Sequence, residues 1–160
     1  MHPREQAAEE LERAFRPLRA VFADQLVPLF VPPWNRIDAR FLPVLEAVGY
    51  GGISTYGARK SVTPAAGLVQ TNTHVDPIFW RGHRGLVDPE TLIAGLTRTL
   101  QARRAEEIDR TEPLGLLTHH LVHTEEVWNF THDVLLVLLD GGAIPSDIGA
   151  LVQAGRRPSI

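Results

Sequence analysis

The chain contains no cysteine, one methionine and no long apolar run, and its charges nearly balance. Without cysteine it has no disulfide, no thiolate zinc site and no cysteine nucleophile. A formal net charge of −3, with basic residues scattered along the chain, does not suit a nucleic-acid or polyanion partner. The longest apolar run, Val134 to Leu139, is too short to span a bilayer, and the polar N-terminus lacks a signal-peptide core. We therefore expect a cytoplasmic protein that binds neither membrane nor nucleic acid.

What is present is a chain of 160 residues with 44% hydrophobic content, enough for one domain with a core. Apolar side chains recur at three- and four-residue spacing from about Arg4 to Phe22, which predicts an opening helix. Further helices are expected at about 38–48, 88–104 and 124–139, and short strands at about 27–31, 51–55, 68–73 and 114–118. We expect residues 1–142 to form the domain and residues 143–160 to be a weakly patterned tail.

Strand and helix patterns alternate, which predicts an α/β fold with parallel strands and helices outside them. Only about four strands are predicted, whereas a closed parallel barrel needs roughly eight. The sheet is therefore either open or part of a barrel.

Polar and aromatic side chains follow three of the predicted strands. The segments are Val31-Pro32-Pro33-Trp34-Asn35-Arg36, Asp76-Pro77-Ile78-Phe79-Trp80 and Leu117-Thr118-His119-His120. The carboxyl ends of neighbouring parallel strands lie at one edge of a sheet. We therefore predict that Trp34, Asp76, Trp80 and His119 converge in one site.

These three segments resemble, in the same order, the third, fourth and fifth motifs of the polysaccharide deacetylase family. This is the chitooligosaccharide deacetylase homology domain of carbohydrate esterase family four, and the similarity extends roughly from Leu26 to Leu139, including to a bacterial branch of the family. The resemblance implies a partial or distorted parallel (β/α) barrel that lacks its first strands. It also implies a hydrolase of carbohydrate metabolism that uses a divalent metal, zinc or similar, to cleave an N-acetyl carbon–nitrogen bond in a carbohydrate.

The resemblance also implies roles for individual residues. In the family, the histidine of the Leu-x-His motif protonates the departing amine, and His119 is the matching residue. A carboxylate beside it, Asp76, would favour the imidazolium form and hold its orientation. The residue types themselves also suit a glycan groove. Trp34 and Trp80 can stack on sugar rings, and Asn35, Arg36 and Asp76 can bond to hydroxyls, although packing inside the fold explains each tryptophan equally well.

The metal-binding motifs of the family have no counterpart here. Family members hold the metal through an aspartate and two histidines from motifs that precede the proline-tryptophan motif, and nothing before Val31 resembles these motifs. No residue is therefore assigned as a metal ligand. A truncated gene, a degenerate copy, and a non-catalytic relative that binds glycans or requires a partner all fit this pattern.

His120 and His123 are alternatives to His119. Alternation along a strand sends His119 and His120 to opposite faces, so one of them is structural unless the strand ends between them. The three histidines lack an adjoining carboxylate that would complete a zinc site. We expect His123 to contribute little to turnover, and His74 and His83 to be surface residues.

Overall fold

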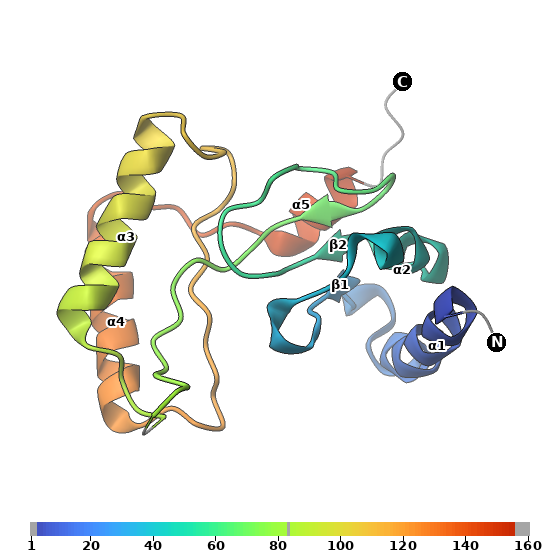
Figure 1. Cartoon of the computed structure of the whole chain (residues 1–160), viewed down its shortest axis with the longest axis horizontal. Helices are drawn as coiled ribbons and strands as arrows, with labels where there is room; N and C mark the ends of the chain where they lie inside the picture. Colours follow the sequence, from blue (N-terminus) through green and yellow to red (C-terminus); the bar gives the residue numbers. More distant parts are fainter. Residues whose placement is uncertain (1–2, 83, 156–160) are drawn as a thin grey trace. The chain divides into compact units, whose positions relative to one another are not determined.

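The computed structural model describes residues 3–82 and 84–155, which fall into two compact units. The first unit comprises residues 3–72 together with 147–155, and the second comprises residues 73–146. In the sequence, the second unit is therefore inserted between β3 and α5 of the first (Figure 1).

The first unit is a small parallel sheet with helices packed against it. Its elements are α1 (Pro3–Phe22), η1 (Ala23–Gln25), β1 (Leu29–Phe30), η2 (Pro33–Asn35), η3 (Ala39–Phe41), α2 (Leu42–Val48), β2 (Gly52–Ile53), β3 (Val69–Gln70) and α5 (Ile148–Gly155). The strand order is β1-β2-β3, and Leu29 and Val69 both pair with Gly52 in parallel register. Gly49 ends α2 with a φ of 107°, a left-handed conformation that glycine adopts without strain.

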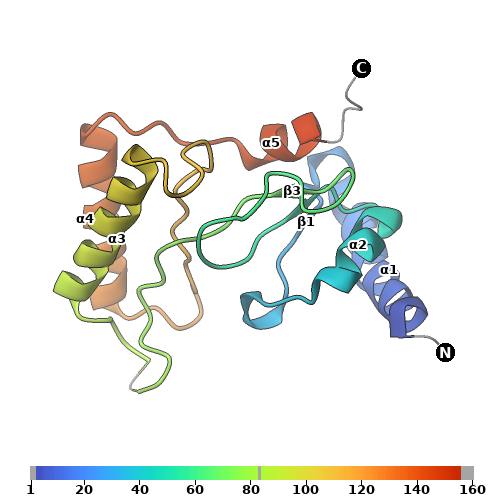
Figure 2. The same cartoon turned by 45° about the horizontal axis from the view of Figure 1, so that its top comes forward.

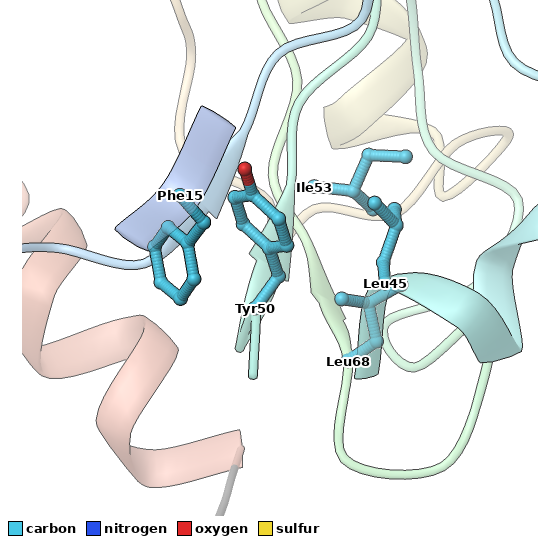
Figure 3. Close-up of a cluster of buried hydrophobic side chains, with 5 residues drawn as sticks. All are labelled: Phe15, Leu45, Tyr50, Ile53 and Leu68. Carbon is cyan, nitrogen blue, oxygen red and sulfur yellow. The ribbon is translucent and has the colours of Figure 1, made fainter. Parts of the chain in front are cut away.

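The core of the first unit lies where α1 and α2 meet the sheet (Figure 3). Phe15 of α1 stacks on Tyr50 with ring centroids 4.3 Å apart. Leu45, Ile53 and Leu68 complete the buried cluster. The predicted opening helix is confirmed, and the apolar stripe that predicted it supplies Phe15 to this core.

Helix α5 packs beside β3, within the stretch that we expected to be weakly patterned (Figure 1). Its Val152 is completely buried, with 0% of its surface exposed. The C-terminal residues of the described chain therefore belong to the core of the first unit.

Replacing Val152 by alanine is expected to lower the free energy of unfolding by about 2 kcal/mol, because it removes two buried methyl groups. The control is Val21→Ala on α1, where the side chain is 75% exposed and the expected change is within about 0.5 kcal/mol. Chemical denaturation followed by circular dichroism measures both. Equal losses in the two variants would show that α5 does not pack on the sheet.

The second unit contains two helices joined by long irregular segments. Helices α3 (Pro89–Arg104) and α4 (Glu125–Asp140) lie next to each other in both views (Figures 1 and 2). Asp88 caps α3 by accepting the backbone N–H of Thr91 at 2.9 Å. Thr124 caps α4 in the same way through its hydroxyl oxygen and the N–H of Val127, at 3.5 Å. The helices that these caps predicted are confirmed.

The barrel expected from the resemblance is wrong. In the described part of the chain the sheet is open and three-stranded, and about half of the chain is helical. Each strand pairs over two residues only, and Pro28 and Pro32, which have no N–H to donate, flank β1. The strand predicted at 114–118 is reduced to one parallel bridge, between Leu116 and Val75. A continuous hydrogen-bonded barrel cannot be built from such short pairings.

In residues 3–82 and 84–155, no helix combines the length and the apolar character needed to cross a bilayer.

Candidate active site

A carboxylate and an imidazole meet at one end of the bridged segments of the second unit. Val75 and Leu116 pair in parallel, and the N–H of Leu117 donates to the carbonyl of Val75 at 2.8 Å. The residues that follow each segment therefore emerge at the same end. There, Nε2 of His119 lies 3.2 Å from Oδ2 of Asp76, with the side chains 25% and 17% exposed. The structure thus pairs the two residues to which the resemblance gave catalytic roles.

Asp76 is held in place by donors from its own segment. Its Oδ1 accepts the backbone N–H of Ile78 at 3.0 Å, and its Oδ2 accepts the indole N–H of Trp80 at 2.8 Å. The ring of Trp80 also packs edge-on against His119, with centroids 4.7 Å apart. Trp80 therefore orients the carboxylate and contacts its partner imidazole at the same time.

The bond to Asp76 fixes which nitrogen of His119 is available for chemistry. A carboxylate only accepts hydrogen bonds, so Nε2 of His119 carries a proton in this contact. The other nitrogen, Nδ1, makes no hydrogen bond to any residue that the structure describes. His120 is exposed and lies in the turn that follows, because the bridged segment ends before it. Of the two neighbouring histidines, His119 is the one placed for proton transfer at Nδ1.

A second imidazole supports the backbone of the first. The N–H of His119 donates to Nε2 of His123 at 2.9 Å, and the carbonyl of His119 accepts the N–H of Val122 at 2.8 Å. The ring of His123 packs edge-on against Trp128 of α4, with centroids 4.4 Å apart. Burial lowers the pKa of His123, the charges of His119 and His120 lower it further, and Asp76 opposes them. Sequence reasoning missed Trp128, although an aromatic residue in the first turn of a helix that follows a histidine cluster was an available signal.

The expectation that His74 is a surface residue is wrong, whereas His83 lies outside the described residues. The side chains of His74 and Glu112 are 3% and 1% exposed, and Nε2 of His74 lies 3.3 Å from Oε2 of Glu112. Nδ1 of His74 accepts the N–H of Gly115 at 3.2 Å, so Nε2 is the donor to the carboxylate. Arg103 donates to the carbonyl of Glu112. This buried pair ties together the two segments that carry Asp76 and His119.

The other predicted site residues belong to the first unit. Trp34 is 89% exposed and occupies the left-handed region at φ 58°, and Asn35 follows it at φ 53°. Arg36 is exposed beside them. Asp76, Trp80 and His119 belong to the second unit. The convergence of the two groups in a single site therefore stays a prediction.

The described residues do not fit the divalent metal that the resemblance implies. They contain no cluster of three or more histidine, aspartate or glutamate side chains that would hold an ion. Around the dyad, Oδ2 of Asp76 already binds Trp80 and His119, and Nε2 of His123 binds a backbone N–H. We therefore assign no metal ligand and no water-activating step to these residues.

Neither a family model, nor a curated protein, nor a solved structure matches the chain. The polysaccharide deacetylase resemblance consequently depends on the three short motifs, and the case for function depends on the geometry of the Asp76–His119 pair.

Proposed function

We propose that this chain contributes the acid group to hydrolysis of an N-acetyl carbon–nitrogen bond in a carbohydrate, with the metal site supplied by residues other than those described. The observation that carries this proposal is the 3.2 Å contact between Asp76 and His119, which leaves Nδ1 of His119 available. A general acid must be oriented toward a leaving group, and this pair orients an imidazole.

The proton step assigned to the dyad is simple. In the imidazolium form, His119 keeps one proton on Nε2 in the bond to Asp76 and carries the second on Nδ1. Water adds to the acetyl carbonyl carbon, where its oxygen forms the new carbon–oxygen bond, and one of its protons goes to a base outside the described residues. As the carbon–nitrogen bond of this adduct breaks, its electron pair goes to nitrogen, and Nδ1 of His119 delivers its proton there. The products are a free amino sugar and acetic acid, which ionises to acetate, and His119 is left neutral. Asp76 keeps the ring in position throughout because it is fixed by Trp80 and Ile78.

Trp80 is suited to place the sugar beside this acid. Its side chain is 44% exposed although its indole N–H is bound to Asp76. Aromatic faces stack on the apolar faces of sugar rings, and such rings give orientation as well as binding energy. A sugar on the exposed part of Trp80 would lie within reach of His119, whose ring contacts the same indole. The cytoplasmic location expected from the sequence belongs to this proposal as well.

A second candidate function, glycan binding without catalysis, is favoured by the turn at Trp34. Two successive residues with a side chain, Trp34 and Asn35, occupy the left-handed region, which costs about 1–2 kcal/mol for each. This strained turn presents an almost fully exposed indole next to Arg36. An exposed aromatic side chain on a strained turn is typical of a binding surface.

Binding of the tetramer of N-acetylglucosamine separates the two functions, because binding does not need the metal. We expect the tetramer to bind more tightly than its fully deacetylated form. We expect Trp80→Ala to weaken binding about ten-fold, which is about 1.4 kcal/mol and lies within the range of about 0.5–1.5 kcal/mol for a stacked aromatic ring. Calorimetry measures the affinity, and Trp34→Ala is the matched variant in the first unit. Loss only in Trp34→Ala would favour the non-catalytic function, and loss in both would support one shared site. Absence of binding at millimolar tetramer would contradict both functions.

A further inference from the structure

The turn after the dyad is closed by His123. This ring returns four residues later to accept the backbone N–H of His119 at 2.9 Å through Nε2. The carbonyl of His119 is held as well, by the N–H of Val122 at 2.8 Å. Both backbone groups of His119 are therefore bound within one short turn. The position of its side chain relative to Asp76 depends on that turn.

The bond requires one particular form of His123. A nitrogen that accepts a hydrogen bond carries no proton, so the ring must be neutral with its single proton on Nδ1. That Nδ1 is buried, and no residue that the structure describes accepts a hydrogen bond from it. The ring is held by Trp128 instead, whose indole packs against it at a centroid distance of 4.4 Å. His123 is thus held in the Nδ1–H tautomer, and its ring makes a hydrogen bond to the described residues through Nε2 alone.

We propose that His123 is a pH-sensitive positioning residue for the dyad. As a neutral imidazole it holds the backbone of His119 so that the side chain meets Asp76. Protonation places a second proton on Nε2, breaks the bond to the His119 N–H, and releases the turn. The consequence for turnover rests on the proposed acid role of His119, whereas the hydrogen bond itself does not.

The groups around His123 favour the neutral form at neutral pH. Burial lowers its pKa, and the positive forms of His119 and His120 act in the same direction, while Asp76 acts against them. Helix α4, which packs against the ring through Trp128, carries Glu125 and Glu126 in its first turn, and both are exposed. The ordinary pKa of histidine is about 6.5. The hydrogen bond from the His119 N–H to His123 should therefore persist above about pH 6.5 and be lost as the pH falls through the lowered pKa of His123. A proton on His119 also makes a proton on His123 less favourable.

Nuclear magnetic resonance of the full chain between about pH 7.5 and 4.5 tests this proposal without any substrate. We expect ring nitrogen shifts that identify the Nδ1–H tautomer of His123 at pH 7.5, a midpoint below about 6.5, and a His119 amide signal that shifts with the same midpoint. A His119 amide that does not follow the titration of His123, or an Nε2–H tautomer at pH 7.5, would overturn the proposal.

Two substitutions separate the hydrogen bond from the titration. Glutamine places an uncharged acceptor near the Nε2 position, so His123→Gln should keep the His119 amide protected from exchange and remove its pH-dependent shift. His123→Phe keeps a ring against Trp128 without an acceptor, and should speed exchange of that amide at least about ten-fold. His132→Gln on α4 is the control, because His132 is exposed and its hydrogen-bonding partner in the described part of the chain is Asp133. Unchanged exchange in a folded His123→Phe would overturn the proposal.

The turnover measurement comes last and separates this proposal from the proposed function. The sequence led us to expect that His123 contributes little to turnover, and its bond to the His119 N–H replaces that expectation. Where the chain deacetylates N-acetylglucosamine oligomers, His123→Phe should lower kcat at least about ten-fold with a smaller change in KM, and His123→Gln should flatten the acidic limb of the kcat profile. If the resonance results are as expected and no deacetylation is found, the proposed function fails and the role of His123 stands. If deacetylation is found and the His119 amide signal does not change as His123 titrates, the proposed role of His123 is wrong and the proposed function is unaffected.

Discussion

Replacing His119 by alanine is expected to lower kcat for N-acetyl hydrolysis by about 10²- to 10⁴-fold, the usual contribution of a positioned general acid. KM should change much less, because the leaving amine is protonated as its bond breaks and not when the sugar binds. The measurement is steady-state release of acetate from N-acetylglucosamine oligomers, by the chain combined with the metal-bearing segment that the proposed reaction requires.

The matched control for that loss is His120→Ala. His120 is the next residue along the chain and is exposed. The imidazole that contacts Asp76 belongs to His119, so His120→Ala removes a neighbouring imidazole and leaves the dyad in place. A large loss in His120→Ala with none in His119→Ala would assign the acid to His120. Robust hydrolysis by the 160-residue chain alone would contradict the inference that the metal site is supplied from outside the described residues.

Replacing His74 by alanine is expected to lower the free energy of unfolding by about 3–5 kcal/mol, which corresponds to about 10 °C in Tm. The substitution removes the donor to the buried carboxylate of Glu112 and the acceptor of the Gly115 N–H, and it leaves a cavity. Denaturation followed by tryptophan fluorescence measures it. A Trp34→Phe background leaves Trp80 and Trp128 as reporters, so that the signal comes from the second unit.

His132→Ala is a close control for His74→Ala. His132 also lies 3.3 Å from a carboxylate oxygen, that of Asp133, but these side chains are 69% and 75% exposed. An exposed ion pair contributes little, so we expect a change within about 0.5 kcal/mol. Similar losses in the two variants would mean that burial does not set the strength of the His74–Glu112 pair.

The helices of this chain were predictable because their signals are local. Asp88 and Thr124 cap α3 and α4. The apolar spacing around Phe15 predicted the bounds of α1 to within one residue at each end. Each of these signals lies within a few residues of the element that it predicts. The strands were overestimated because their length depends on partners far away in the sequence, and the pairing of β1 with β2 stops after two residues.

The candidate site was predictable to a similar extent. A histidine at the end of an apolar segment pointed to His119, and order along the chain together with the resemblance pointed to Asp76. The supporting contacts were not predictable, because they join residues 38 positions apart, as in His74 and Glu112, or depend on a turn that the strand pattern did not contain, as in His123. Burial of a histidine and a glutamate is decided by such contacts and not by their residue types.

Because residues 73–146 are inserted between β3 and α5, the ribosome synthesises the whole second unit before it completes the first unit. The second unit emerges as one continuous stretch, and all of it has been synthesised before α5 is made. The first unit must wait for α5, whose Val152 is buried in it, and at about 5–20 residues per second this delay is roughly ten seconds after β3 emerges. During that interval Val69 of β3 lacks the helix that packs beside it, so this edge strand of the sheet stays uncovered until α5 has been synthesised.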